Sequence, residues 1–149
     1  MPDRMNPARF CFGCGPENPR GLGLHFRVEE GRAVAEFTPQ DFLQGFPGFV
    51  HGGGVATVLD EAMGWAAYAR GVWAMTAKLN MRFRRSVPLR QQVKVEGWVT
   101  RERGRFLEVS AELRSRQGHL LAEAEGLFVK LDGEKAEEVR RQYEAAARG

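Results

Sequence analysis

The sequence lacks long apolar runs and any strong excess of charge. No segment reaches the roughly 18 consecutive apolar residues of a membrane-spanning helix, and the N-terminal Met-Pro-Asp-Arg lacks the apolar centre of a signal peptide. We therefore expect a cytoplasmic protein without a membrane partner. The 22 Lys and Arg residues against 19 Asp and Glu give a net charge of +3. That excess does not by itself indicate nucleic acid, no segment is typical of a helix-turn-helix, and a polyanionic small molecule suits the charge equally well.

Cysteine is also scarce, because Cys11 and Cys14 are the only two and form one Cys-x-x-Cys pair. A structural zinc site usually has four ligands in two such pairs. His25 offers a third ligand, and no fourth stands out. We interpret the cysteines as reduced thiols in an N-terminal turn and predict no metal. Metal binding and redox chemistry remain the less favoured alternatives.

The chain is long enough for one domain with its own core. Its 43% hydrophobic and 28% charged residues are typical of a folded, soluble protein. Pro, Gly, Asn and Cys crowd residues 1–21 without a sustained period, which indicates an irregular lead-in. We expect the folded domain over 22–132 and a charged surface helix over 133–149.

A helix is predicted from Gly53 or Gly54 to Arg70, with Gly71 as its C-terminal stop. Its residues are small and apolar on nearly every side, so a sheet or a partner subunit must enclose it. Phe42, Phe46 and Phe49 precede it in a loop over 38–50, which we expect to pack against another surface.

Period-two patterns predict six strands around this helix. Segments 22–28 and 32–37 form a hairpin, and 91–103, 105–117 and 119–131 form an antiparallel meander with turns at Gly104 and Gly118. Strand 76–84 alternates, with Ala77, Leu79, Met81 and Phe83 on one face, and is expected to be half-buried. The fold class is therefore α+β, a sheet curled around one helix.

Two acidic residues, Asp60 and Glu61, interrupt the most apolar stretch of this helix. Burying a carboxylate there costs several kcal/mol unless it is paired or hydrogen-bonded. Helical spacing places Asp60 on a smooth stripe of small residues with room for a substrate, and Glu61 beside Trp65 and Tyr68.

Three glycines after His51 expose backbone N–H groups at the helix start, which makes them a candidate oxyanion hole. A donor facing a carboxylate suits hydrolysis of a thioester, whose thiolate leaves easily. Each feature also has a structural interpretation. The glycines suit a tight turn or phosphate nest, His51 suits a helix cap, and Asp60 suits a carboxylate bonded to a loop. The combination of the three features favours an active site over these separate structural roles.

At these residues the sequence resembles the PaaI-like hotdog-fold thioesterases. The resemblance covers Cys11 to Leu131 and rests on three segments: Cys-x-x-Cys with Asn18-Pro19-x-Gly21-Leu22, Gly45-Phe46-Pro47-Gly48-x-Val50-His51-Gly52-Gly53, and Asp60 nine residues after His51. It implies a hotdog fold, a long central helix wrapped by a five- or six-stranded antiparallel sheet. It further implies a homodimer or homotetramer whose subunits pair their sheets edge to edge, with active sites between subunits.

The resemblance also implies roles for single residues. Asp60 would act as nucleophile or general base, and the Gly52 N–H of the partner subunit would polarise the thioester carbonyl. His51 would orient that turn, and Thr76 would assist. Substrate contacts are predicted at Gly53, Gln44 and Glu61, and at Arg84 and Arg85, whose guanidinium groups suit the phosphates of coenzyme A; a solvated strand face is the alternative for these arginines.

The sequence departs from some relatives, which carry a water-holding asparagine six residues before the histidine. Gly45 stands there, with Gln44 beside it. Either Gln44 substitutes, or Asp60 attacks the carbonyl directly through an anhydride, and the sequence leaves both routes open.

The leading hypothesis is an acyl-CoA thioesterase that releases a small or medium acid. The aromatic residues Phe42, Phe46, Phe49 and Trp65 favour an aromatic one. No cofactor is expected, since coenzyme A belongs to the substrate. Two alternatives share the fold: a non-catalytic acyl-CoA-binding module, and a hydratase or dehydratase of acyl thioesters, which needs a histidine paired with an acid.

Overall fold

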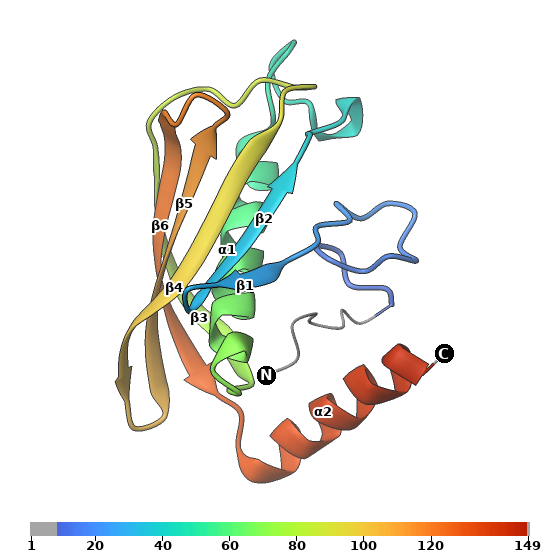
Figure 1. Cartoon of the computed structure of the whole chain (residues 1–149), viewed down its shortest axis with the longest axis vertical. Coiled ribbons are helices and arrows are strands. Elements are labelled where there is room, and N and C mark those ends of the chain that lie inside the picture. Colours follow the sequence, from blue (N-terminus) through green and yellow to red (C-terminus); the bar gives the residue numbers. More distant parts are fainter. Residues whose placement is uncertain (1–8, 149) are drawn as a thin grey trace.

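The chain folds into one curved sheet with a long helix on its inner face (Figure 1). The structure is a computed structural model that describes residues 9–148, so the first eight residues of the predicted lead-in and Gly149 lie outside the described part. The elements in chain order are β1 (Arg27–Glu29), β2 (Arg32–Phe37), a 3-10 turn (Asp41–Leu43), α1 (Gly52–Ala69), β3 (Ala74–Phe83), β4 (Val93–Arg103), β5 (Phe106–Ser115), β6 (Leu120–Lys130) and α2 (Gly133–Arg148).

The sheet has six strands in the order β1-β2-β4-β5-β6-β3, and every neighbouring pair is antiparallel. Gly104 and Gly118 turn the chain between the last three strands with φ of 57° and 90°, a left-handed conformation that glycine adopts without strain. The predicted α+β class, the meander and its glycine turns are therefore confirmed.

Helix α1 packs on the concave face of the sheet through Leu59, Ala62, Met63 and Ala66, all at most 1% exposed. The approach is close at Gly97 of β4, where a Cβ atom would lie 2.3 Å from the carbonyl oxygen of Ala62. Only glycine allows this separation. The prediction that a sheet encloses this apolar helix is confirmed.

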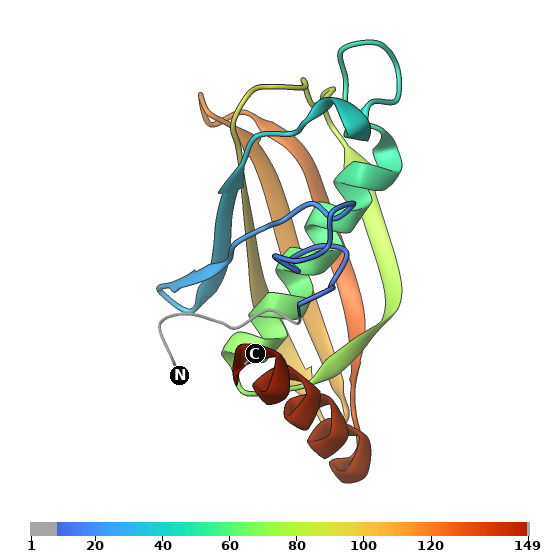
Figure 2. The ribbon, with the colours of Figure 1, turned by 90° about the vertical axis from the view of Figure 1, so that its right-hand side faces the viewer.

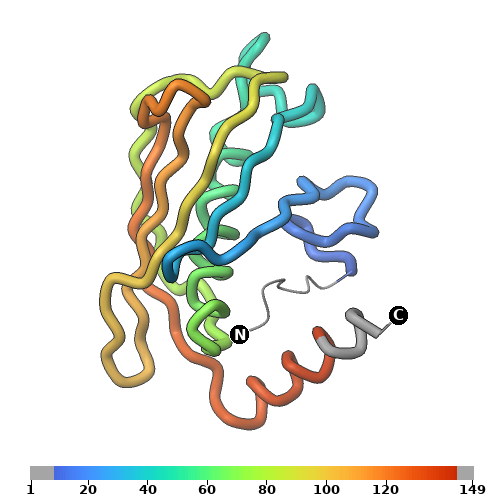
Figure 3. Tube along the Cα trace, viewed as in Figure 1, coloured from blue at the N-terminus to red at the C-terminus, as the bar shows by residue number. Residues whose placement is uncertain are grey.

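The N-terminal segment covers the side of α1 that faces away from the sheet (Figures 2 and 3). Cys14, Leu24 and Phe26 are buried there. The expected strand over 22–28 is correct only at its end, because the N–H groups of Leu22 and Leu24 donate to the carbonyls of Phe12 and Gly13, at 2.9 Å in each case. The lead-in takes the donors that a longer β1 would have used.

Strand β3 forms the edge of the sheet next to β6, and the expectation that it is half-buried is wrong within one chain. Met75 is 64% exposed, Leu79 36% and Phe83 56%. Nothing in the described chain lies beyond this edge strand, so its apolar side chains remain open to solvent.

A β-bulge at Ala77 also changes which side chains of β3 face the helix. Thr76 pairs with Phe128 and Lys78 with Leu127, so Ala77 is the extra residue. Because paired residues share a face, Thr76 points the same way as buried Phe128, toward the helix. The simple alternation that we expected places Thr76 on the opposite face, and the bulge corrects this.

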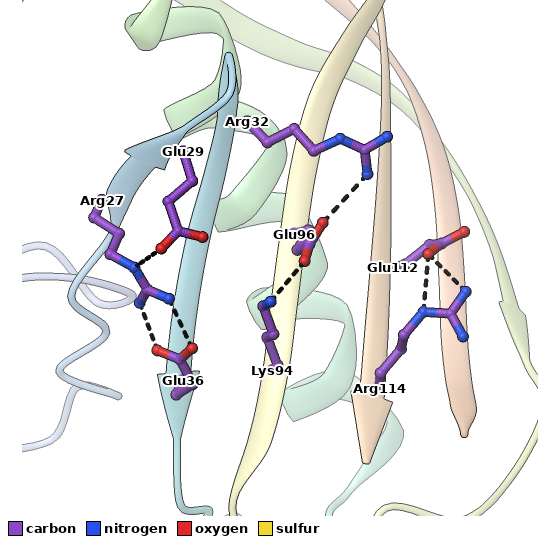
Figure 4. A network of polar contacts seen from close by, with 8 residues as sticks. All are labelled: Arg27, Glu29, Arg32, Glu36, Lys94, Glu96, Glu112 and Arg114. Carbon is purple, nitrogen blue, oxygen red and sulfur yellow. Dashed lines mark hydrogen bonds and ion pairs between the residues drawn. The ribbon is translucent and has the colours of Figure 1, made fainter. Parts of the chain in front are cut away.

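The outer face of the sheet is polar and carries ion pairs across its strands (Figure 4). Arg27 bonds Glu36 and Glu29, and this contact lowers the pKa of the Glu36 carboxyl. Arg32 and Lys94 both reach Glu96, at 3.2 and 3.0 Å. Exposed pairs of this kind add at most about 1 kcal/mol each, so the core rather than this face stabilises the sheet.

Helix α2 follows β6 and contacts the loop after α1 through Tyr143, whose ring centroid lies 4.9 Å from that of Trp73. The predicted C-terminal helix is therefore present and begins at Gly133. Within residues 9–148, neither helix has the length and apolar character needed to cross a bilayer.

The helix-to-sheet contact can be tested at Gly97. We expect Gly97→Ala to lower the free energy of unfolding by about 1–3 kcal/mol or more, because its methyl group would overlap the Ala62 carbonyl. Urea unfolding measures the loss. Gly133→Ala is the matched control, since a Cβ there meets no atom within 4 Å. Equal stability of the two variants would contradict the close packing.

Candidate active site

The start of α1 is fixed by His51, which is its N-cap residue. The Nδ1 atom of His51 accepts a hydrogen bond from the Gly53 N–H at 2.9 Å, and its carbonyl accepts from the Gly54 N–H at 2.8 Å. The helix begins at Gly52, one or two residues before the expected start at Gly53 or Gly54, and the Gly52 N–H is left as a first-turn donor with no partner among residues 9–148. Of the three predicted glycine donors, Gly52 alone remains available to a ligand.

Asp60 lies further along the same helix, and its carboxylate Oδ1 accepts a hydrogen bond of 2.7 Å from the Thr76 hydroxyl. The two residues come from α1 and β3. The bulge at Ala77 makes the contact possible, because it turns Thr76 toward the helix. The structure thus brings together two of the predicted catalytic residues.

The four predicted catalytic residues line two separate cavities. One cavity, of about 530 Å³, is lined by His51, Gly52, Gln44, Gly45, Phe46, Phe49, Val50 and Ser86. The other, of about 350 Å³, contains Asp60 and Thr76 and is otherwise lined by Cys11, Glu61, Gly64, Trp65, Tyr68, Val72, Trp73, Ala74, Met75, Phe128 and Tyr143. The two linings share no residue. Gly52 and Asp60 are eight residues apart, which is about 12 Å along a helix axis, so one chain cannot direct both groups at one carbonyl.

The loop before His51 explains the missing asparagine. A Cβ atom on Gly45 would lie 2.9 Å from the Cα of His51, so a larger side chain would displace the cap. The Gln44 side-chain carbonyl accepts from the Gly48 N–H at 3.1 Å, which braces this loop. Gln44 still borders the cavity of His51, as the predicted substrate contact requires.

Glu61 faces the N-terminal segment, where its Oε1 accepts from the Cys11 thiol at 3.4 Å. One donor atom each from Cys11, Cys14 and Glu61 lie within 4.8 Å of one another. Burial raises the pKa of the Glu61 carboxyl to about 7. The hydrogen bond between the two thiols lowers the pKa of Cys11 and raises that of Cys14, which burial raises further. Sequence reasoning missed this cluster, although the Cys-x-x-Cys pair was a signal for it.

An aromatic series extends from α1 to α2 along the cavity of Asp60. Ring centroids lie 5.4 Å apart for Trp65 and Tyr68, and 4.7 Å apart for Tyr68 and Trp73, before the Tyr143 contact. Sequence reasoning placed Trp65 and Tyr68 beside Glu61 but missed Trp73 and Tyr143, because these two come from the loop after α1 and from α2.

The two predicted arginines lie away from both cavities. Arg84 and Arg85 follow β3 and line neither cavity; Arg84 reaches Glu123 at 3.4 Å and Arg85 reaches the Nδ1 of His119 at 3.2 Å. The described chain supplies no surface for the phenylalanine loop, because Phe42, Phe46 and Phe49 are 61%, 84% and 42% exposed, and its packing against another surface stays a prediction. These side chains have no covering partner in the described chain.

Known proteins resemble this chain both in sequence and in fold. The family model described as Thioesterase superfamily matches residues 47–122, from the loop before His51 to β6. The acyl-coenzyme A thioesterase THEM4 of Mus musculus is 42% identical over 120 residues, 77% of this chain and 52% of that protein. The chain belongs to the thioesterase superfamily. It spans about half the length of THEM4.

Solved structures confirm the hotdog fold and the PaaI-like resemblance. The thioesterase superfamily protein RHA08564 superimposes with a TM-score of 0.78 at 32% identity, over 81% of this chain and 60% of that one. The E. coli PaaI protein gives 0.70 at 20% identity, over 75% and 82%. The smu.793 protein of Streptococcus mutans, solved bound to acetyl CoA, gives 0.68 at 18% identity, over 72% and 88%.

The two thiols should differ in reactivity. In the reduced chain at neutral pH, we expect iodoacetamide to alkylate Cys11 at least about tenfold faster than Cys14, because Cys11 is less buried and its pKa is lowered. Peptide mass spectrometry measures both sites. Equal labelling after unfolding in urea is the control, and equal labelling of the folded chain would contradict the assignment.

Proposed function

We propose that this protein hydrolyses acyl-CoA thioesters, with Asp60 as nucleophile or general base and the Gly52 N–H as oxyanion donor. The observation that carries the proposal is the Asp60–Thr76 hydrogen bond, which fixes a carboxylate at an apolar cavity within a thioesterase-superfamily fold. The name of the THEM4 relative and the acetyl CoA bound to the smu.793 protein support acyl-CoA as the substrate class.

The chemistry needs one donor and one carboxylate. The Gly52 N–H binds the carbonyl oxygen as it becomes negatively charged. On the general-base route, Asp60 takes a proton from water, the hydroxide adds to the carbonyl carbon, and the C–S bond breaks as the coenzyme A thiolate leaves and is protonated. On the nucleophilic route, the carboxylate adds to the carbonyl carbon, the C–S bond breaks as the thiolate leaves and is protonated, and water hydrolyses the resulting anhydride to release the acid and restore Asp60. The Thr76 hydroxyl holds the carboxylate in place on either route.

Two copies of the chain are needed to assemble this site. Within one chain, Gly52 and Asp60 border different cavities. The unpaired edge of β3 and its exposed Leu79 and Phe83 offer the surface for a second copy. A two-fold dimer through this edge would place each Gly52 opposite the partner's Asp60, and a homotetramer would pair two such dimers.

The cavity beside Asp60 favours a medium-sized or aromatic acyl group. Its volume of about 350 Å³ is small, and Trp65, Tyr68, Trp73 and Tyr143 border it. Flat rings on several sides favour edge or stacking contacts with an aryl group. Arg84 and Arg85, at the exposed end of β3, would meet the coenzyme A phosphates at the subunit boundary.

The role of Asp60 can be tested with Asp60→Asn. The amide keeps the shape and still accepts the Thr76 hydrogen bond, but it can neither attack nor take a proton. We expect kcat to fall by about 10²–10⁴-fold, measured as thiol release across a panel of acyl-CoA esters. Glu125→Gln on the exposed outer face is the matched control.

Wild-type turnover by Asp60→Asn would exclude the proposed role. Stabilisation of the wild type by acyl-CoA without any thiol release would instead identify a binding module.

The donor role of Gly52 can be separated from its shape. Gly52→Pro removes the N–H at the first helical position, where proline is tolerated, and we expect kcat to fall by about 10²–10³-fold. Gly52→Ala keeps the N–H, and its Cβ would meet only the Phe83 ring at 3.9 Å. Activity of this control should stay near that of the wild type.

Co-expression of the two inactive variants tests the shared site. Random pairing of Asp60→Asn with Gly52→Pro chains makes about half of the dimers mixed, and each mixed dimer holds one intact site of two. We therefore expect about a quarter of wild-type activity. An inactive mixture containing mixed dimers would place both groups in one chain's site.

A further inference from the structure

The N-terminal loop is built around the carboxylate of Glu61. A Cβ atom on Gly13 would lie 2.5 Å from Cδ of Glu61, and one on Gly15 would lie 2.3 Å from the backbone nitrogen of Cys11. The Gly15 N–H donates to the Cys11 carbonyl at 2.8 Å, which closes a tight turn. Glycine at both positions lets the loop bring two sulfur atoms against one carboxylate.

This carboxylate has no cationic partner among residues 9–148. Most glutamates that make side-chain contacts on the sheet pair with arginine or lysine, as Glu96 does with Arg32 and Lys94. Glu61 contacts the thiol groups of the cysteine pair instead, and Cys14 is only 1% exposed. A charged, partly buried carboxylate beside two thiols costs free energy unless a proton or a metal cation neutralises it.

The spacing of the three donor atoms suits a tetrahedral metal ion. Zinc binds thiolate sulfur at about 2.3 Å and carboxylate oxygen at about 2.0–2.2 Å, which separates neighbouring ligand atoms by roughly 3.5–3.8 Å. The donor atoms of Cys11, Cys14 and Glu61 all lie within 4.8 Å of one another. Small movements of side chains would therefore complete the geometry.

We propose that Cys11, Cys14 and Glu61 form a binding site for a thiophilic divalent cation, with Zn²⁺ as the natural occupant. Two thiolates select against Mg²⁺ and Ca²⁺, which prefer oxygen ligands. Three protein ligands leave a fourth position for water. Cys11 and Glu61 line the cavity of Asp60 whereas Cys14 does not, so two of the three ligands border that cavity.

The ligands differ from those that the sequence suggested. His25, the third ligand considered there, is exposed and is not part of the cluster. Glu61 takes its place from a helix 47 residues after Cys14, and no spacing rule for zinc motifs would have found it. A metal at this site would tie the N-terminal segment to α1 one residue from Asp60.

Cobalt binding to the full chain tests the proposal, after reduction with a phosphine and removal of metals with a chelator. We expect one equivalent of Co²⁺ to give a thiolate-to-cobalt absorption band, and Zn²⁺ to displace it. Zn²⁺ should also protect both thiols from a thiol reagent and raise the Tm of the wild type. These measurements on the wild type need no variant to fold.

Variants then assign the ligands. We expect Cys11→Ser, Cys14→Ser and Glu61→Gln each to weaken Co²⁺ binding by roughly 100-fold, since each removes one ligand. His25→Ala is the matched control and should bind as the wild type does. The proposal is overturned if the reduced chain gives no cobalt band, if the band persists at full strength in Cys11→Ser, or if it disappears in His25→Ala.

Discussion

The rest of the structure depends on the close contact between α1 and the sheet. At Gly97 the strand comes so close that a single methyl group would strike the Ala62 carbonyl. A helix held at this distance buries its small apolar residues against the strands, and the N-terminal segment covers its other side. The helix therefore has little room for polar groups. Its acidic residues lie only at the edges of the surface that the sheet and the N-terminal segment cover.

Asp60 and Glu61 are neighbours in sequence but meet different surroundings because a helix turns by about 100° per residue. Asp60 points toward the open edge of the sheet and receives the Thr76 hydroxyl. Glu61 points under the N-terminal loop and receives the Cys11 thiol. The raised pKa of Glu61, about 7, follows from this cover. One helix thus presents two carboxylates with separate partners, and the cavity of Asp60 touches both.

The sequence predicted what local patterns encode. The apolar helix, the meander and the glycine turns follow from periodicity and backbone freedom, and the roles proposed for Asp60 and Gly52 follow from a motif. Local patterns did not predict the contacts between segments that are distant in the sequence. The shortening of β1 depends on Leu22 and Leu24 bonding to the lead-in, and the Glu61–Cys11 contact joins residues 50 positions apart. Phe46 and Leu79 are exposed because nothing among residues 9–148 covers them, and a periodic pattern does not show which apolar residues stay uncovered.

The bulge at Ala77 has an effect on the far side of β3 as well. An irregular residue interrupts the row of backbone donors and acceptors on both edges of a strand, and it increases the local twist. A strand added at this edge would find an even ladder only beyond the bulge, along Lys78 to Phe83. The backbone groups beside Thr76 would then form no hydrogen bonds with the added strand. This unpaired part of the edge would let solvent and a long, flexible ligand reach Asp60 while the rest of the edge is paired.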